Sequence, residues 1–108
     1  MTDREMLELA ARAAGRNLLL CAPDDVRGVS TTAGWWNPLG DDRAALRLAV
    51  QLELRFVVDA HNRVVVCEAE EIHYDEAKFG GDCDPYAATR RAIVRAAAEI
   101  WRQMEVQS

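Results

Sequence analysis

The spacing of hydrophobic residues predicts a first helix over about 3–14. Its apolar positions recur three and four residues apart, at Met6, Leu9, Ala10, Ala13 and Ala14. Thr2 and Glu5 have the spacing of a capping box, in which each side chain satisfies a backbone amide of the first turn. Gly15 can adopt the left-handed conformation that ends many helices.

Two further helices are indicated in the same way, over about 41–53 and 84–104. The second follows Pro38 and begins among aspartates, which favour a helix N-terminus. The third begins at Asp84, with Pro85 at its first position, where the missing amide costs nothing. Its apolar arc contains Tyr86, Ile93, Ala97, Ile100, Trp101 and Met104. We expect Ile93, Ala97, Ile100 and Trp101 to be buried.

Strand signals lie between these helices. Residues 17–22 are apolar and are followed by a Pro-Asp-Asp turn, and 26–32 are a plausible returning strand. Residues 54–59 alternate with period two, and 63–69 return after a turn at Ala60-His61-Asn62. Residues 71–83 have no clean periodicity, so we expect a long loop there.

The resulting order is αββαββα, which is typical of the α+β class. Two hairpins would build a mostly antiparallel four-stranded sheet, and three amphipathic helices could cover both of its faces. We therefore expect a three-layer α/β/α sandwich. The 108 residues, with no internal linker, correspond to a single domain over 1–108.

Charge and cysteine content narrow the possible environments. The net charge of −5 makes general affinity for nucleic acid unfavourable. The longest apolar run is too short to span a membrane, and the acidic N-terminus does not resemble a signal peptide. Cys21, Cys67 and Cys83 are odd in number and widely spaced, which favours reduced thiols in a cytoplasm over a disulfide framework or a metal site. We expect no cofactor.

Three motifs resemble a known family. The first is Arg4-Glu5-Met6-Leu7-Glu8-Leu9-Ala10-Ala11 followed by Ala14-Gly15. The second is Trp36-Asn37-Pro38-Leu39 with Asp41-Asp42, leading into 45–50, and the third is 84–94, which begins Asp84-Pro85-Tyr86. In this order they resemble the phage ABA sandwich domain, a family of small proteins encoded by phages and prophages. The resemblance implies helices flanking a sheet and a protein of the host bacterial cytoplasm. It implies no catalytic residues.

An acidic stretch and a tryptophan pair are the first candidate site. Five carboxylates fall within nine residues, at Glu68, Glu70, Glu71, Asp75 and Glu76, and their mutual repulsion requires either solvent or a cationic partner. The stretch is either a solubilising strand end and loop or a docking surface for a basic protein. Neighbouring side chains of an extended segment point to opposite sides, so we expect Trp36 in the core and Trp35 partly exposed. Trp35 is a candidate interface residue.

Arginines of the last helix are an alternative site. Arg91, Arg95 and Arg102 share one stripe opposite the apolar arc, which is typical of a phosphate-binding strip and also of an ordinary helix surface. Arg90 falls within the apolar arc, where it can extend along the core or pair with a carboxylate.

A metal or catalytic site is the weakest interpretation. His73, Asp75, Asp82 and Cys83 lack the paired short spacing of zinc ligands. A Cys83–His73 nucleophilic pair would lack a third, orienting group. The sequence thus favours a non-catalytic phage or prophage accessory protein that binds a host or phage protein with a basic surface, such as an inhibitor of host defence with an anti-CRISPR role. The alternative is a nucleic-acid-associated accessory protein using the basic stripe.

Overall fold

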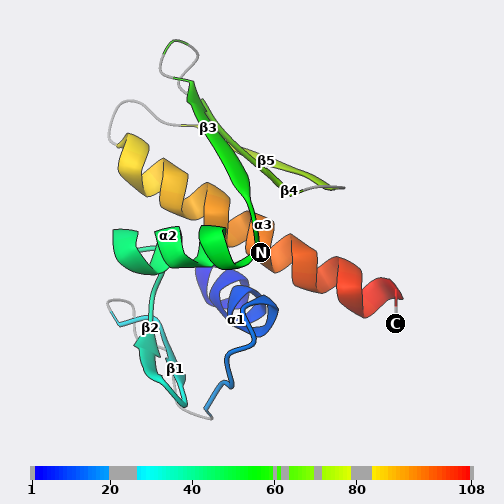
Figure 1. Cartoon of the computed structure of the whole chain (residues 1–108). Helices are drawn as coiled ribbons and strands as arrows, with labels where there is room; N and C mark the ends of the chain where they lie inside the picture. Colours follow the sequence, from blue (N-terminus) through cyan, green and yellow to red (C-terminus); the bar gives the residue numbers. More distant parts are fainter. Residues whose placement is uncertain are drawn as a thin grey trace.

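The structure is a computed structural model that describes residues 2–19, 27–59, 61, 64–69, 72–78 and 84–107. The described residues form three helices and five strands (Figure 1). In chain order these are α1 (Asp3–Ala13), β1 (Val29–Thr31), β2 (Gly34–Trp36), α2 (Asp42–Gln51), β3 (Arg55–Asp59), β4 (Val64–Ala69), β5 (Ile72–Lys78) and α3 (Pro85–Gln107). The order αββαβββα contains one strand more than the sequence predicted.

Local capping groups fix the helix starts where they were predicted. The Thr2 hydroxyl accepts a hydrogen bond from the Glu5 amide at 3.2 Å, and the Asp84 carboxylate accepts one from the Ala87 amide at 2.7 Å. Asp41 caps α2 by accepting from the Arg43 amide at 3.1 Å. Each cap satisfies a backbone donor that has no partner within its helix.

The ends of α1 and α2 share one backbone motif. The Arg16 amide donates to the Ala11 carbonyl at 2.9 Å, and Gly15 lies between them with φ +74°. After α2 the Leu54 amide donates to the Ala49 carbonyl at 2.9 Å, with Glu53 in the same place at φ +55°. This is the Schellman arrangement, whose left-handed position favours glycine. In α2 a glutamate occupies it.

The smaller sheet pairs β1 with β2 in antiparallel register, with Thr31 opposite Gly34. Residues 17–19 run along the other side of β1, because the Leu19 amide donates to the Ser30 carbonyl at 2.9 Å. The predicted pairing of 17–22 with 26–32 is confirmed for these residues, and 20–26 lie outside the described residues. The strand β2 was not predicted.

The larger sheet has the antiparallel order β3-β4-β5. The hairpin predicted over 54–69 is confirmed by β3 and β4, in which Val57 stands opposite Val66. The strand β5 falls in the segment expected to be a loop. Apolar Ile72 and Tyr74 alternate with polar residues, but the pattern breaks at Glu76, so the sequence alone does not reveal that this segment pairs with β4.

The prediction of one four-stranded sheet is wrong, because the strands form separate sheets of two and three strands. The predicted layer order also differs from the arrangement of the described elements. The helix α3 packs against α1, α2, β4 and β5, and it lies between α1 and the larger sheet (Figure 1). The helix α3 can lie between these elements because small residues are buried on more than one of its sides. These residues are Ala88, Ala92, Val94, Ala96 and Ala98. The α+β class stands.

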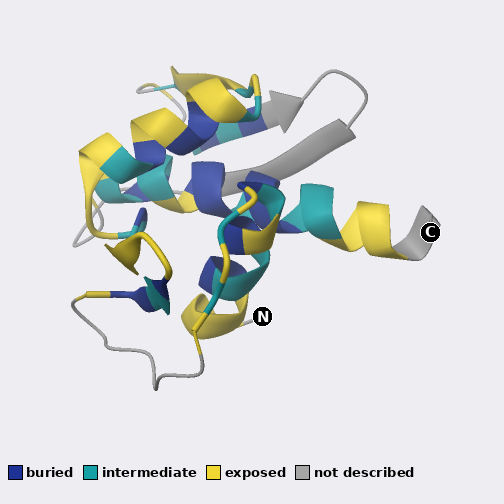
Figure 2. Ribbon diagram, turned by 60° about the horizontal axis from the view of Figure 1, so that its bottom comes forward, coloured by how far each residue is buried: buried dark blue, intermediate teal, exposed yellow. Residues whose placement is uncertain are grey.

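The core is concentrated in the middle of α3 and on the facing side of α1 (Figure 2). Ile93 and Ala97 are buried as predicted, whereas Ile100 and Trp101 are only half-buried. At the two ends of α3, Tyr86 is 70% exposed and Met104 is 53% exposed. The apolar arc therefore extends beyond the elements that cover it.

Candidate functional site

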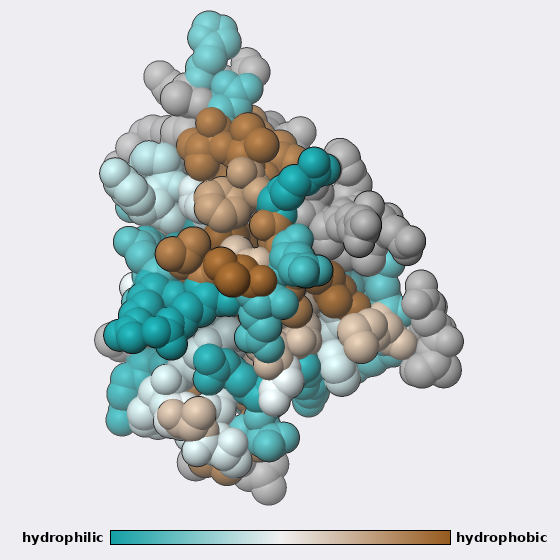
Figure 3. Space-filling model, viewed as in Figure 1, coloured by the Kyte–Doolittle hydropathy of each residue, from teal (hydrophilic) through white to brown (hydrophobic). Residues whose placement is uncertain are grey.

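An apolar groove of about 450 Å³ lies between α2, β3 and the first half of α3. The residues that line it are Asp42, Ala45, Leu46, Phe56, Val58, Pro85, Tyr86, Thr89, Arg90 and Ile93. Four of its large apolar side chains are substantially exposed: Leu46 (57%), Phe56 (38%), Val58 (44%) and Tyr86 (70%). Hydrophobic side chains gather on this face of the molecule (Figure 3).

The groove exists because the larger sheet is unevenly covered. Phe56 stands opposite Cys67 and Val58 opposite Val65, and residues directly opposite in an antiparallel pair project to the same face. Cys67 and Val65 are fully buried. Because α3 packs more extensively against β4 and β5 than against β3, the same face of β3 is left half-exposed beside α2.

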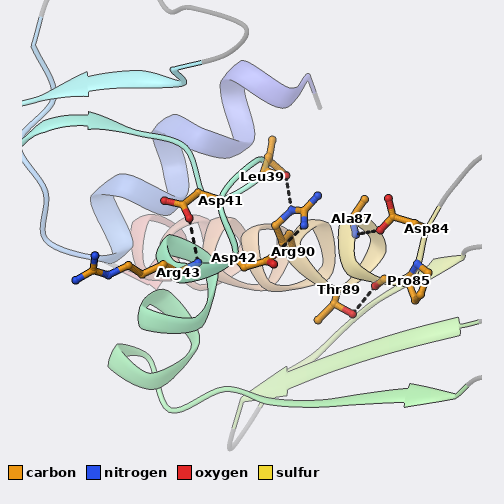
Figure 4. A network of polar contacts seen from close by, with 9 residues as sticks. All are labelled: Leu39, Asp41, Asp42, Arg43, Asp84, Pro85, Ala87, Thr89 and Arg90. Atoms are coloured by element: carbon orange, nitrogen blue, oxygen red, sulfur yellow. Dashed lines mark hydrogen bonds and ion pairs between the residues drawn. The ribbon is translucent and has the colours of Figure 1, made fainter.

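Arg90 anchors the polar side of the groove (Figure 4). Its Nε donates to the Leu39 carbonyl at 2.8 Å, and one of its terminal nitrogens donates to Asp42 Oδ1 at 2.6 Å. The Arg90 side chain is 19% exposed and the Asp42 side chain is 73% exposed. Of the two alternatives for Arg90, the structure shows the pairing with a carboxylate. The contacts tie the start of α2 to α3 and thereby hold the two helical walls of the groove together.

The lining of the groove is mostly apolar. Among the described lining residues the ionisable side chains are Asp42, Tyr86 and Arg90, and the remainder are apolar apart from Thr89. The Thr89 hydroxyl donates to the Pro85 carbonyl at 2.7 Å, within its own helix. The arrangement can take up an apolar group and offers a charged pair at one side of it.

The tryptophan pair is divided as predicted. Trp36 is 5% exposed and belongs to the core, and the Arg16 guanidinium lies 5.1 Å from its ring centroid. Trp35 is 41% exposed, and the Arg27 guanidinium lies 4.3 Å above it. Stacking by an arginine satisfies one face of the Trp35 ring within the molecule itself.

The acidic candidates belong to a different part of the fold. Glu68 lies in β4, Asp75 and Glu76 lie in β5, and Glu70 and Glu71 lie outside the described residues. The strands β4 and β5 lie on the opposite side of the helices from β2, which carries Trp35 (Figure 1). The structure thus separates Trp35 from the strands that carry the carboxylates.

The arginine stripe is partly neutralised. Arg91 pairs with Asp3 of α1 at 2.9 Å, and Arg102 pairs with Glu99 at 2.8 Å. Arg95 is half-buried. Carboxylates beside two of three arginines reduce the positive potential that attracts a phosphate backbone.

Residues proposed for a metal or catalytic site are not brought into a described cluster. Asp82 and Cys83 lie outside the described residues, and His73 and Asp75 belong to β5. Within the described residues, no three His, Cys, Asp or Glu side chains are placed to hold a metal ion.

The groove was not predicted from the sequence, although Arg90 was recognised there as a charge within an apolar arc. The available signal was in α2, where Leu46 and Val50 lie four residues apart, away from the buried side formed by Ala45, Leu48 and Ala49. Two large apolar residues at that spacing form an exposed patch on a helix.

Comparison of the chain with family models, with curated proteins and with solved structures finds no match. Of the helices in the described residues, none is both long and apolar enough to cross a membrane.

Proposed function

We propose that this protein acts without catalysis by binding another protein, and that the groove between α2, β3 and α3 receives an apolar side chain of the partner. The observation that carries the proposal is the concave cluster of exposed Leu46, Phe56, Val58 and Tyr86. Large apolar side chains gathered in this way on a surface mark interaction sites.

The dimensions of the groove support a substantial contribution to affinity. Its volume of about 450 Å³ lies within the range of roughly 300–1,000 Å³ typical of ligand pockets. Full burial of one leucine or phenylalanine contributes about 1.5–3 kcal/mol. Since about 1.4 kcal/mol corresponds to a tenfold change in Kd, one anchoring side chain is worth about 10- to 100-fold in affinity.

Charge favours a cationic partner. The chain has a net charge of −5, the exposed Asp42 lines the groove, and the exposed Asp84 precedes Pro85, which also lines it. A basic protein would approach this surface faster and in a preferred orientation. The proposed partner segment therefore has an aromatic or aliphatic anchor with arginine or lysine beside it.

The more specific form of the proposal is a prophage-encoded inhibitor of host defence, which acts in the bacterial cytoplasm on a basic host protein. It is supported by the resemblance of the three sequence motifs to small phage proteins and by the acidic charge of the chain. In this form the carboxylates of β4 and β5 would contribute further contacts outside the groove, whereas Trp35 lies on the opposite side of the helices.

A matched pair of substitutions on α2 tests the groove. Leu46 and Val50 are both exposed apolar residues of the same helix, but only Leu46 lines the groove. Peptides selected from a random display library against the native protein would be measured by fluorescence anisotropy against Leu46→Glu and Val50→Glu. We expect Leu46→Glu to weaken binding at least tenfold and Val50→Glu to leave Kd within twofold.

The composition of the selected peptides is a second readout. We expect a large apolar residue flanked by arginine or lysine, and we expect the affinity to fall as salt concentration rises. Equal losses in both α2 variants, or selected peptides without an apolar anchor, would refute the groove as the binding site. Binding of the native protein to single- or double-stranded DNA, lost in Arg91→Ala with Arg95→Ala, would favour the nucleic-acid alternative instead.

A further inference from the structure

The strand β3 is an edge of the larger sheet. The sheet order is β3-β4-β5, and no strand in the described part of the chain pairs with the outer side of β3. The three central residues of β3 are apolar and exposed: Phe56 (38%), Val57 (63%) and Val58 (44%). An edge strand of this kind offers backbone donors and acceptors to another strand, with apolar side chains on both faces.

The other edge of the same sheet is β5, which has features that discourage pairing with a further strand. The strand β5 carries His73, Asp75, Glu76 and Lys78 among its seven residues. Its pairing with β4 is interrupted by a register shift between Val66 and Glu68. Charges and bulges are the devices that keep an edge from adding strands. The centre of β3 has neither, so β3 is the edge on which a further strand would add.

The charge order along β3 selects the strand that fits it. Arg55 begins the strand and Asp59 ends it. In an antiparallel pair of two β3 strands with the two-fold axis at Val57, Arg55 of each copy stands opposite Asp59 of the other. Phe56 then stands opposite Val58, and the two Val57 residues face each other. A parallel pair would instead align like charges, which is destabilising.

We propose that two copies of this chain associate through β3 in this register, forming one continuous antiparallel sheet of six strands. If the two-fold axis lay at Phe56 or at Val58 instead, a charged residue would stand opposite Val57. Both ion pairs between Arg55 and Asp59 would then be lost. The interface is isologous, as in most homodimers, because the same strand contributes from each copy. The proposal does not depend on the proposed function, which concerns a foreign partner in the groove.

Charge reversal with complementation tests this register. Arg55→Asp gives a strand with two acidic ends and Asp59→Arg a strand with two basic ends, so each variant alone would face like charges. We expect sedimentation velocity to show a concentration-dependent dimer for the native chain and monomers for each single variant. We expect an equimolar mixture of the two to form a heterodimer, which FRET between separately labelled chains would detect.

The mixture also separates association from folding. Arg55 stands opposite Glu68 within its own sheet, so Arg55→Asp can weaken the monomer itself. Mixing restores the intermolecular pairs without changing either chain, and circular dichroism checks that each variant is folded. Val57→Lys, at a 63% exposed position, should also give a monomer. Arg47→Asp, on the exposed side of α2, should leave the dimer unchanged.

Three results would overturn the proposal. The first is a native chain that stays monomeric up to the concentration at which it aggregates. The second is a dimer that persists in Arg55→Asp, Asp59→Arg and Val57→Lys alike, which would place the interface elsewhere. The third is folded single variants that are monomeric and remain monomeric when mixed, which would refute the register and the ion pairs.

Discussion

The glutamate at the end of α2 provides a direct test of the backbone geometry. Glu53 is exposed and has φ +55°, in the place that Gly15 occupies after α1. A residue with a β-carbon in this left-handed region is disfavoured by about 1–2 kcal/mol, and glycine is not. Replacing Glu53 with glycine should therefore remove strain from the folded state and retain the Leu54 to Ala49 hydrogen bond.

The expected gain in the free energy of unfolding is the difference between two contributions. Relief of the left-handed strain is worth about 1–2 kcal/mol, and the greater freedom of glycine in the unfolded chain costs about 0.4–1 kcal/mol. The net stabilisation should be about 0.5–1 kcal/mol. For a domain of this size a change of 1 kcal/mol shifts Tm by about 4 °C, so Glu53→Gly should raise Tm by roughly 2–4 °C.

Differential scanning calorimetry would measure the change in Tm, and urea unfolding would measure the change in the free energy of unfolding. Glu53→Ala controls for loss of the side chain, and it should leave stability nearly unchanged because alanine keeps the β-carbon. Gly15→Ala is the reverse exchange after α1, where no atom of the described residues other than its chain neighbours lies within 4 Å of an added β-carbon. It should cost about 1 kcal/mol through φ alone. A Glu53→Gly variant less stable than the native chain, or a stabilised Glu53→Ala, would refute the conformational explanation.

Three further substitutions have distinct expected costs in urea unfolding. Gly28→Ala should destabilise by at least about 2 kcal/mol, since Gly28 has φ +86° and an added β-carbon would overlap the Trp36 carbonyl oxygen; a loss below about 0.5 kcal/mol would contradict this packing. Arg90→Met should cost about 1.5–3 kcal/mol by removing charge-assisted hydrogen bonds. Asp42→Asn should cost less than about 1 kcal/mol, because the Asp42 side chain is 73% exposed. Equal losses would mean that Arg90 stabilises the fold through the ion pair alone. Trp101→Ala should cost about 1–2 kcal/mol instead of the roughly 3–5 kcal/mol of a core tryptophan, because this side chain is half-buried; a larger loss would show that it is part of the core.

The helices could be predicted from sequence because their signals are local. Thr2 and Asp84 lie next to the amides that they cap, so spacing alone reveals them. The strand β5 could not be predicted, because its alternation breaks at Glu76 and the strand is defined by its pairing with β4. The prediction for α3 assumed that only one face of the helix is buried, and this was wrong. Small buried residues such as Ala92 and Ala96 allow close packing on more than one side.

The groove could not be predicted from local sequence either, because it depends on how the elements pack together. Phe56 and Val58 belong to a correctly predicted strand, but their exposure depends on how far α3 extends across the sheet. Tyr86 was assigned to the apolar arc of α3, and it is 70% exposed because the helix begins beyond its covering elements. Arg90 was recognised as anomalous in that arc, because a charge among apolar residues needs a partner wherever the fold places it.

The central position of α3 affects the order in which the chain can fold. The helix follows every other described element in sequence, and α1, α2, β4 and β5 all pack against it. During synthesis, α1, α2 and the larger sheet leave the ribosome before α3 can cover their apolar faces. Contacts between the first and last helices require closure of a long loop, which slows folding. Nascent chains that stop before α3 should therefore be targets for chaperones and proteases, and stable structure should form only after this helix has been released.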